Sequence, residues 1–201
     1  MEVKKIRKKR GYLRDFQNKD RTISIGIIGA VPGCGVTTMA VAMANYLSGI
    51  NRKRIAIYEY GSKRTFVRMN EYLGDDLVIK HNGCTYYPKG TASLSALYNE
   101  DYHIVVVDFG AEKVGLGEFA RCTYKVVMGS LEPWNFHMYT EFSNMAQEVG
   151  GSDTWLWVVN GDKKTVNRHK KDTGLHMIKR PFIDNPFIIH IGLIEFFEAL
   201  F

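Results

Sequence analysis

Short apolar runs alternate with amphipathic stretches along most of the chain, and this alternation predicts the order of strands and helices. Several runs are apolar at consecutive positions, which is typical of strands that are buried on both faces of a parallel sheet. The expected strands are 23–29, 54–60, 77–79, 84–87, 103–109, 124–130, 155–160 and 176–182. The expected helices are 36–49, 63–73, 91–100, 133–149 and 192–201.

This order predicts an α/β domain built on a doubly wound, mostly parallel sheet with helices on both faces. Gly49 is expected to end the first helix, and Pro133 is expected in the first turn of the helix over 133–149. Residues 162–174 are polar and are expected to form a mobile loop. No apolar run approaches the ~18 residues that a membrane-spanning helix needs.

Positive charge is concentrated at the start of the chain. The 201 residues include 27 Lys and Arg and 21 Asp and Glu, for a net charge of +6. Residues 1–21 hold nine of the basic and three of the acidic side chains, which leaves 18 of each sign in residues 22–201. We therefore expect a basic tail, 1–21, ahead of a neutral domain, 22–201. The tail is either a solvated arm or a contact for anionic lipid, nucleic acid or an acidic protein surface.

Cysteine and histidine usage gives no sign of a disulfide framework or a metal site. Cys34, Cys84 and Cys122 are far apart, with no CxxC spacing, and the six histidines show no paired metal-ligand spacing. The basic N-terminus is not followed by the apolar stretch of a secretory signal. These features favour a protein of the reducing cytoplasm.

A glycine-rich segment, 29–38, joins the first predicted strand to the first predicted helix. This arrangement aims backbone N–H groups and the positive end of a helix at an anion. A P-loop has the form GxxxxGK[ST]. Here Gly33, Gly35 and Thr37 match it, but Val36 stands where the lysine should be. The residues predicted to contact a nucleotide in this loop are Pro32, Gly33, Cys34, Gly35, Val36, Thr37 and Thr38.

The sequence GAVPGCGVTT resembles the GxKGGxGKTT loop of the ParA/MinD-type deviant Walker ATPases. On that pattern Val31 takes the place of the signature lysine, and Val36 that of the general P-loop lysine. The strand ending at Glu59 is similar to the family's second strand, with Glu for Asp. The strand 102–110 looks like the Walker B strand and keeps Asp108.

Two later segments extend the resemblance over roughly residues 22–201. Asn160 ends a strand that looks like the one whose asparagine reads adenine in the family, and 181–186 resembles the proline-bearing loop that closes over the base. The resemblance implies a P-loop NTPase fold that holds ATP or ADP, with Thr37 on Mg²⁺ and Asp108 reaching the metal through water. Glu59 and Asp108 are its candidate catalytic residues.

The two valines predict weak nucleotide binding, or none, and slow hydrolysis. A lysine–phosphate contact is a charge-assisted bond of roughly 1.5–3 kcal/mol, and loss of one preorganised donor costs ~10²–10³ in rate. Lys63 and Arg64 are either substitute cations or solvated charges at a helix start. A purely structural role, in a turn, a helix start or a strand end, is the alternative for each predicted site residue. These are Gly33, Cys34, Gly35, Thr37, Thr38, Glu59, Asp108 and Asn160.

The first functional hypothesis is a degenerate member of this group that acts as a positioning or assembly factor. The loop is most similar to TadZ/CpaE-type proteins, which localise Tad pilus machinery. This implies protein partners in a membrane-associated assembly, a homodimer, and a location at the inner face of the membrane.

Two other functions remain open. One is an active ParA-like ATPase in DNA segregation or cell-division positioning, and the other is a small-molecule kinase or ligase, for which no acceptor site is evident. Because the last helix carries Glu195 and Glu198 on its polar face, it is expected to pack on the core or a partner rather than on anionic lipid.

Overall fold

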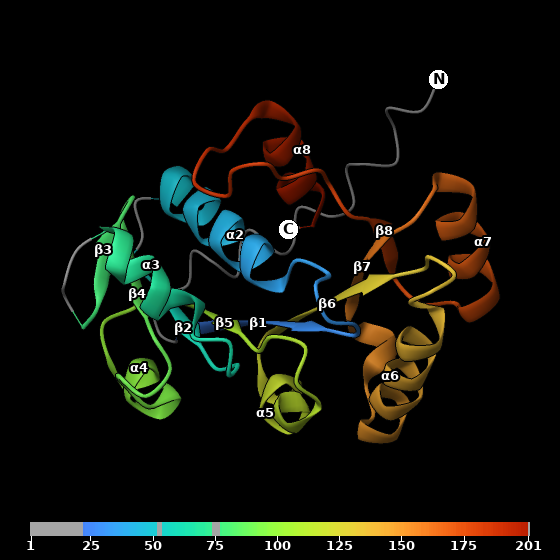
Figure 1. Cartoon of the computed structure of the whole chain (residues 1–201), viewed down its shortest axis with the longest axis horizontal. Coiled ribbons are helices and arrows are strands. Elements are labelled where there is room, and N and C mark those ends of the chain that lie inside the picture. The colour runs from blue at the N-terminus through green and yellow to red at the C-terminus, as the bar shows by residue number, and fades with distance from the viewer. Residues whose placement is uncertain (1–21, 52–53, 74–76, 201) are drawn as a thin grey trace.

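The computed structural model describes residues 22–51, 54–73 and 77–200, so the expectations about the tail, 1–21, lie outside the described residues. Its core is an eight-stranded sheet in the order β3-β4-β2-β5-β1-β6-β7-β8 (Figure 1). All neighbouring strands are parallel except β3 and β4. The strands are β1 Ile23–Gly29, β2 Ile55–Glu59, β3 Ile79–His81, β4 Cys84–Tyr87, β5 Ile104–Asp108, β6 Tyr124–Ser130, β7 Leu156–Asn160 and β8 Met177–Lys179. The predicted doubly wound α/β fold is confirmed.

The three central strands are the most deeply buried part of the sheet. Every residue of β1, β2 and β5 is buried, as their largely apolar sequences predict. In the strand order, β2 lies on one side of β1 and β6 lies on the other. The connection after β1 and the connection after β5 therefore run to opposite sides of the sheet. Ligands of such sheets bind outside the carboxyl ends of the strands, at the point where the strand order reverses. That point lies here at the ends of β1 and β5.

Helices cover both faces of this sheet. They are α2 Val36–Asn51, α3 Thr65–Leu73, α4 Leu94–Asn99, α5 Leu116–Arg121, α6 Phe136–Val149, α7 Lys163–Thr173 and α8 Ile191–Leu200. Short 3-10 turns lie at Lys113–Gly115 and Ser152–Thr154. Figure 1 shows α2 and α8 over one face and α4, α5 and α6 over the other. Tyr46 of α2 stacks on Phe197 of α8 at a ring-centroid distance of 4.9 Å, so the last helix packs on the core.

The prediction of a mobile loop over 162–174 is wrong, because this segment contains α7. The Asp162 carboxylate accepts the N–H of Thr165 at 3.0 Å and caps the helix. Gly174, with φ 69°, ends it. Val166 is the buried residue of α7, and the His169 ring packs against α6. One buried apolar residue is too few to give a helical hydrophobic pattern in the sequence.

Several element limits also differ from the prediction. Helix α2 continues past Gly49 to Asn51, and α6 begins at Phe136, after a turn that contains Pro133. Helix α5 was not predicted, since six residues are too few for a clear period. Among the described residues, no helix is long and apolar enough to cross a membrane.

Substitution of Gly26 tests how closely α5 packs on β1. A Cβ at Gly26 would lie 2.9 Å from both the Cys122 Sγ and a Phe119 ring carbon. We expect Gly26→Ala to lower the free energy of unfolding by about 1–3 kcal/mol through overpacking, as measured by urea denaturation. Gly117→Ala, in the same region, meets nothing within 4 Å and should leave stability unchanged or raise it. Equal stability of the two variants would contradict the packing.

Candidate functional site

The loop between β1 and α2 has the backbone of an anion cradle. Gly33 and Gly35 have φ values of 75° and 90°, in the left-handed region that favours glycine. The first N–H groups of α2 have no acceptor within the helix, and its positive end faces the loop. The predicted strand–turn–helix arrangement of Pro32 to Thr38 is therefore present.

The apolar side chains of the loop are buried against the end of β1. Val31 and Val36 are only 1% and 6% exposed. A Cβ at Gly29 would lie 2.8 Å from the Cys34 Sγ and 2.9 Å from Val36 Cγ2, so both side chains pack against the end of β1. Burial raises the pKa of Cys34 to about 11, which keeps the thiol protonated and unreactive. The loop therefore offers main-chain donors but no cation of its own.

Thr37 and Asp108 are brought together beside this loop. Asp108 ends β5 and is 2% exposed. Its carboxylate accepts the N–H of Gly110 at 2.9 Å. Burial raises the pKa of Asp108, while the nearby Thr37 hydroxyl, the Gly110 N–H and the charge of Lys63 act in the opposite direction. The pair is the arrangement that the sequence predicted for a metal site.

The donor set of this pair fits Mg²⁺. Mg²⁺ prefers hard oxygen ligands, keeps several waters, and is often held by one or two protein groups together with substrate phosphates. The Thr37 hydroxyl and the Asp108 carboxylate supply such oxygens. Within the described ranges, no group of three or more His, Cys, Asp or Glu side chains could form an all-protein metal site.

The other predicted polar residues are occupied by structural partners. The Glu59 carboxylate accepts the N–H groups of Thr65 and Phe66 at 2.5 and 3.3 Å, so it caps α3. Burial raises the pKa of Glu59. The Asn160 side-chain amide donates to Glu132 Oε1 at 2.8 Å, at the carboxyl end of β7. Both side chains lie at the expected edge of the sheet, but these bonds satisfy them.

Two loops at this edge are joined to each other. Ser62, just after β2, donates its N–H to Glu112 Oε1 at 2.6 Å, and its hydroxyl also bonds to this carboxylate. A Cβ at Gly61 would lie 3.3 Å from the Gly110 backbone, so the two chains pass close together. We call the Ser62–Glu112 contact the latch. It links the loop that follows Glu59 to the loop that follows Asp108.

An arginine that is absent from the predicted site contacts the glycine-rich loop. Arg180, which follows β8, donates from Nη1 to the Cys34 carbonyl at 2.7 Å. A Cβ at Gly35 would lie 2.9 Å from the same Nη1. Of the two predicted substitute cations, Lys63 influences Asp108 and Cys34 electrostatically. The Arg64 carbonyl instead accepts the Arg68 N–H at the start of α3.

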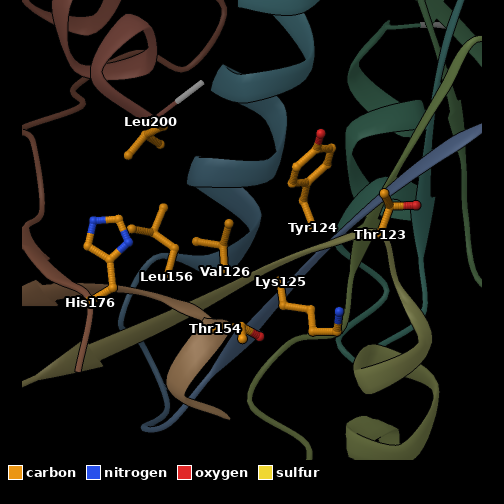
Figure 2. A pocket seen from close by; sticks show the side chains of 8 residues that line it. All are labelled: Thr123, Tyr124, Lys125, Val126, Thr154, Leu156, His176 and Leu200. Atoms are coloured by element: carbon orange, nitrogen blue, oxygen red, sulfur yellow. The ribbon is translucent and has the colours of Figure 1, made fainter. Parts of the chain in front are cut away.

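A separate pocket of about 230 Å³ lies at the opposite edge of the sheet (Figure 2). It is formed around the amino ends of β6 and β7, whereas Thr37 and Asp108 lie at the carboxyl ends of β1 and β5. The pocket is lined by Thr123, Tyr124, Lys125, Val126, Thr154, Leu156, His176 and Leu200. It is therefore distinct from the candidate nucleotide site.

Comparison with known proteins supports the fold. No protein-family model and no curated protein sequence matches the chain. A plasmid partition protein from Borrelia burgdorferi bound to AMPPNP is similar in structure, with a TM-score of 0.65, 17% identity, and 90% and 97% of the two chains covered. A ParA family ATPase from Chlorobium tepidum gives a TM-score of 0.57 at 16% identity, over 81% and 86%. At this identity the likeness shows the fold alone, a mostly parallel α/β sheet with helices on both faces.

The latch predicts a pH-dependent contribution to stability. The hydrogen bonds from Ser62 lower the pKa of Glu112, so the ionised carboxylate is favoured in the folded state. Its contribution is present above the pKa of the unfolded chain and is lost as pH falls through the lower folded value. We expect Glu112→Gln to reduce the free energy of unfolding by about 1 kcal/mol or less at pH 7. In acid the difference should vanish.

Urea denaturation from pH 7 down to pH 3 measures this difference. Glu118→Gln, which removes an exposed partner of Arg121, is the control and should show a smaller change. A Glu112→Gln cost that stays constant across this range would contradict the assignment of the effect to the ionised latch.

Proposed function

We propose that this chain is a degenerate ParA-type P-loop protein that binds ATP or ADP with Mg²⁺ weakly and hydrolyses it slowly or not at all. The observation that carries the proposal is an intact main-chain cradle beside the Thr37–Asp108 pair, in a loop whose two lysine positions are buried valines. The backbone donors are those of residues 32–38. Thr37 would hold Mg²⁺ directly and Asp108 through water.

The surroundings of the pair support binding better than catalysis. Phosphoryl transfer depends on positioned cations and on a group that orients the attacking water. Glu59, the candidate for that group, is held by the N-terminus of α3. Its role as a cap explains its burial without a catalytic task, so we assign no general base among the described residues.

Bound nucleotide would act by organising the loops after β2 and β5. These loops are joined by the latch, and Val114, 92% exposed, follows in the second of them. Trp134 and Phe182, 74% and 80% exposed, lie in segments that follow the carboxyl ends of β6 and β8. Exposed apolar side chains at one edge of a domain suit a protein partner.

On this basis the chain serves as a nucleotide-responsive positioning or assembly factor. The resemblance of its loop to TadZ/CpaE-type proteins points to a membrane-associated Tad-type pilus or secretion assembly. A second copy of the chain is the other partner that the apolar residues suit. The basic tail, 1–21, would add attraction to anionic lipid at the inner membrane face.

An active ATPase in DNA segregation or cell-division positioning is the second candidate. Arg180 beside the loop favours it, because a cation from another segment can take over the task of a lysine. The body of the protein, 22–201, is electrically neutral, so DNA binding would rest on the tail. A salt-sensitive gel shift with duplex DNA that disappears on removal of residues 1–21 would favour this candidate. No shift at low salt would count against it.

A nucleotide titration tests the proposed function directly. We expect calorimetry to show binding of AMPPNP and ADP that Mg²⁺ strengthens. Thr37→Ala and Asp108→Asn should remove the Mg²⁺ effect, because each takes away an oxygen ligand or its orienter. Thr140→Ala, on α6 and away from the loop, is the control. Turnover of ATP should stay below the ordinary enzyme range of ~1–10³ s⁻¹. Absence of any nucleotide binding, or turnover within that range, would overturn the proposal.

A further inference from the structure

The guanidinium of Arg180 lies against the glycine-rich loop. It comes from the segment after β8, 146 residues from the loop that it contacts. Its Nη1 donates to the Cys34 carbonyl at 2.7 Å and approaches Gly35, whose missing side chain leaves the room. The main chain of Arg180 is fixed as well, because its N–H donates to the Val159 carbonyl at 2.8 Å.

Arg180 is not neutralised by a carboxylate. Across the described parts of the chain, the ion pairs within 4 Å are those of Arg54, Lys113 and Arg121, and Arg180 makes none. A guanidinium has five N–H donors in a planar fork, and the Cys34 carbonyl accepts from one nitrogen. A half-buried cation with free donors beside an anion cradle is suited to an anionic ligand.

We propose that Arg180 is the phosphate-binding cation of this site, and that it replaces from outside the loop the lysines absent at positions 31 and 36. The inference rests on the proposed function and names the ligand class, a nucleoside diphosphate or triphosphate with adjacent phosphates. The planar fork binds two phosphate oxygens while Nη1 keeps the loop in place. Lys63, whose charge also reaches Asp108, is an exposed auxiliary cation.

This placement also couples the ligand to the segment 181–186. Arg180 begins that segment at the loop, and the Pro186 carbonyl accepts a hydrogen bond from the Asn45 side chain of α2 at 3.5 Å. The segment is thus tied at one end to the glycine-rich loop and at the other to the middle of α2. A phosphate that engages the guanidinium fixes the near end, two residues from the exposed Phe182.

The experiment compares Arg180→Gln, Arg180→Lys and Lys179→Gln with the unchanged protein. Lys179 is the exposed neighbour on β8, so its variant controls for loss of one charge in the same segment. Binding of AMPPNP, ADP, AMP and inorganic pyrophosphate is measured by calorimetry in the presence of Mg²⁺. Circular dichroism and the urea midpoint establish that each variant is folded, and Arg180→Lys retains a donor for Cys34 should Arg180→Gln not fold.

We expect Arg180→Gln to weaken AMPPNP, ADP and pyrophosphate binding about 10- to 150-fold, the range for one charge-assisted contact. AMP binding should change less, Arg180→Lys should restore part of the affinity, and Lys179→Gln should match the unchanged protein.

If the unchanged protein binds nucleotides and the Arg180 variants bind them equally well, the role of Arg180 is refuted and the proposed function stands. If it binds pyrophosphate through Arg180 but no nucleotide, the anion site stands and the proposed function fails. If it binds none of these ligands, both are refuted.

Discussion

The packing of Cys34 and Val36 against Gly29 is the constraint on which the candidate site depends. Because Gly29 has no side chain, the loop can fold its own side chains beneath itself at the end of β1. Backbone hydrogen bonds fix the same point, from the N–H of Gly29 to the Gly110 carbonyl at 2.7 Å and from Ala30 to the Met128 carbonyl at 2.7 Å. The loop is thus tied to both neighbouring strands, which holds Thr37 beside Asp108.

Because of this packing, the shape of the site and its positive charge come from different groups. The cradle is shaped by glycine dihedrals and apolar support, neither of which needs a lysine. In the proposed site the cations come instead from separate segments, Arg180 after β8 and Lys63 after β2. A lysine within the loop is preorganised for phosphate, whereas a cation on a separate segment must be positioned with that segment. Under the proposed function, ligand affinity therefore depends on how these segments are arranged. This dependence suits a protein that changes conformation on ligand binding better than one that turns over nucleotide rapidly.

The sequence predicted the sheet well, because consecutive apolar residues leave few alternatives for β1, β2 and β5. It also placed Thr37 and Asp108 at one edge, since parallel strands bring their carboxyl ends together. It missed α7, whose buried face rests on Val166 and which is held by a cap and by ring contacts across to α6. It missed Arg180 because no spacing rule links that residue to a loop 146 positions earlier. The role of Glu59 as a cap depended on where α3 begins, which the pattern placed two residues too early.

The likeness to ParA-type structures at 13–17% identity has the same basis, because the shape of the fold does not depend on the charged groups of the site. Apolar strands, left-handed glycines and close helix–sheet contacts preserve the fold while most side chains change. Activity rests on far fewer groups, and under the proposed function two of those positions are the buried Val31 and Val36. A lysine at either buried position would have to extend its ammonium group out of the apolar surroundings, because a buried charge without a partner is costly. Under the proposed function, a cation that serves the phosphates comes from a separate segment, and Arg180 already contacts the loop at the Cys34 carbonyl.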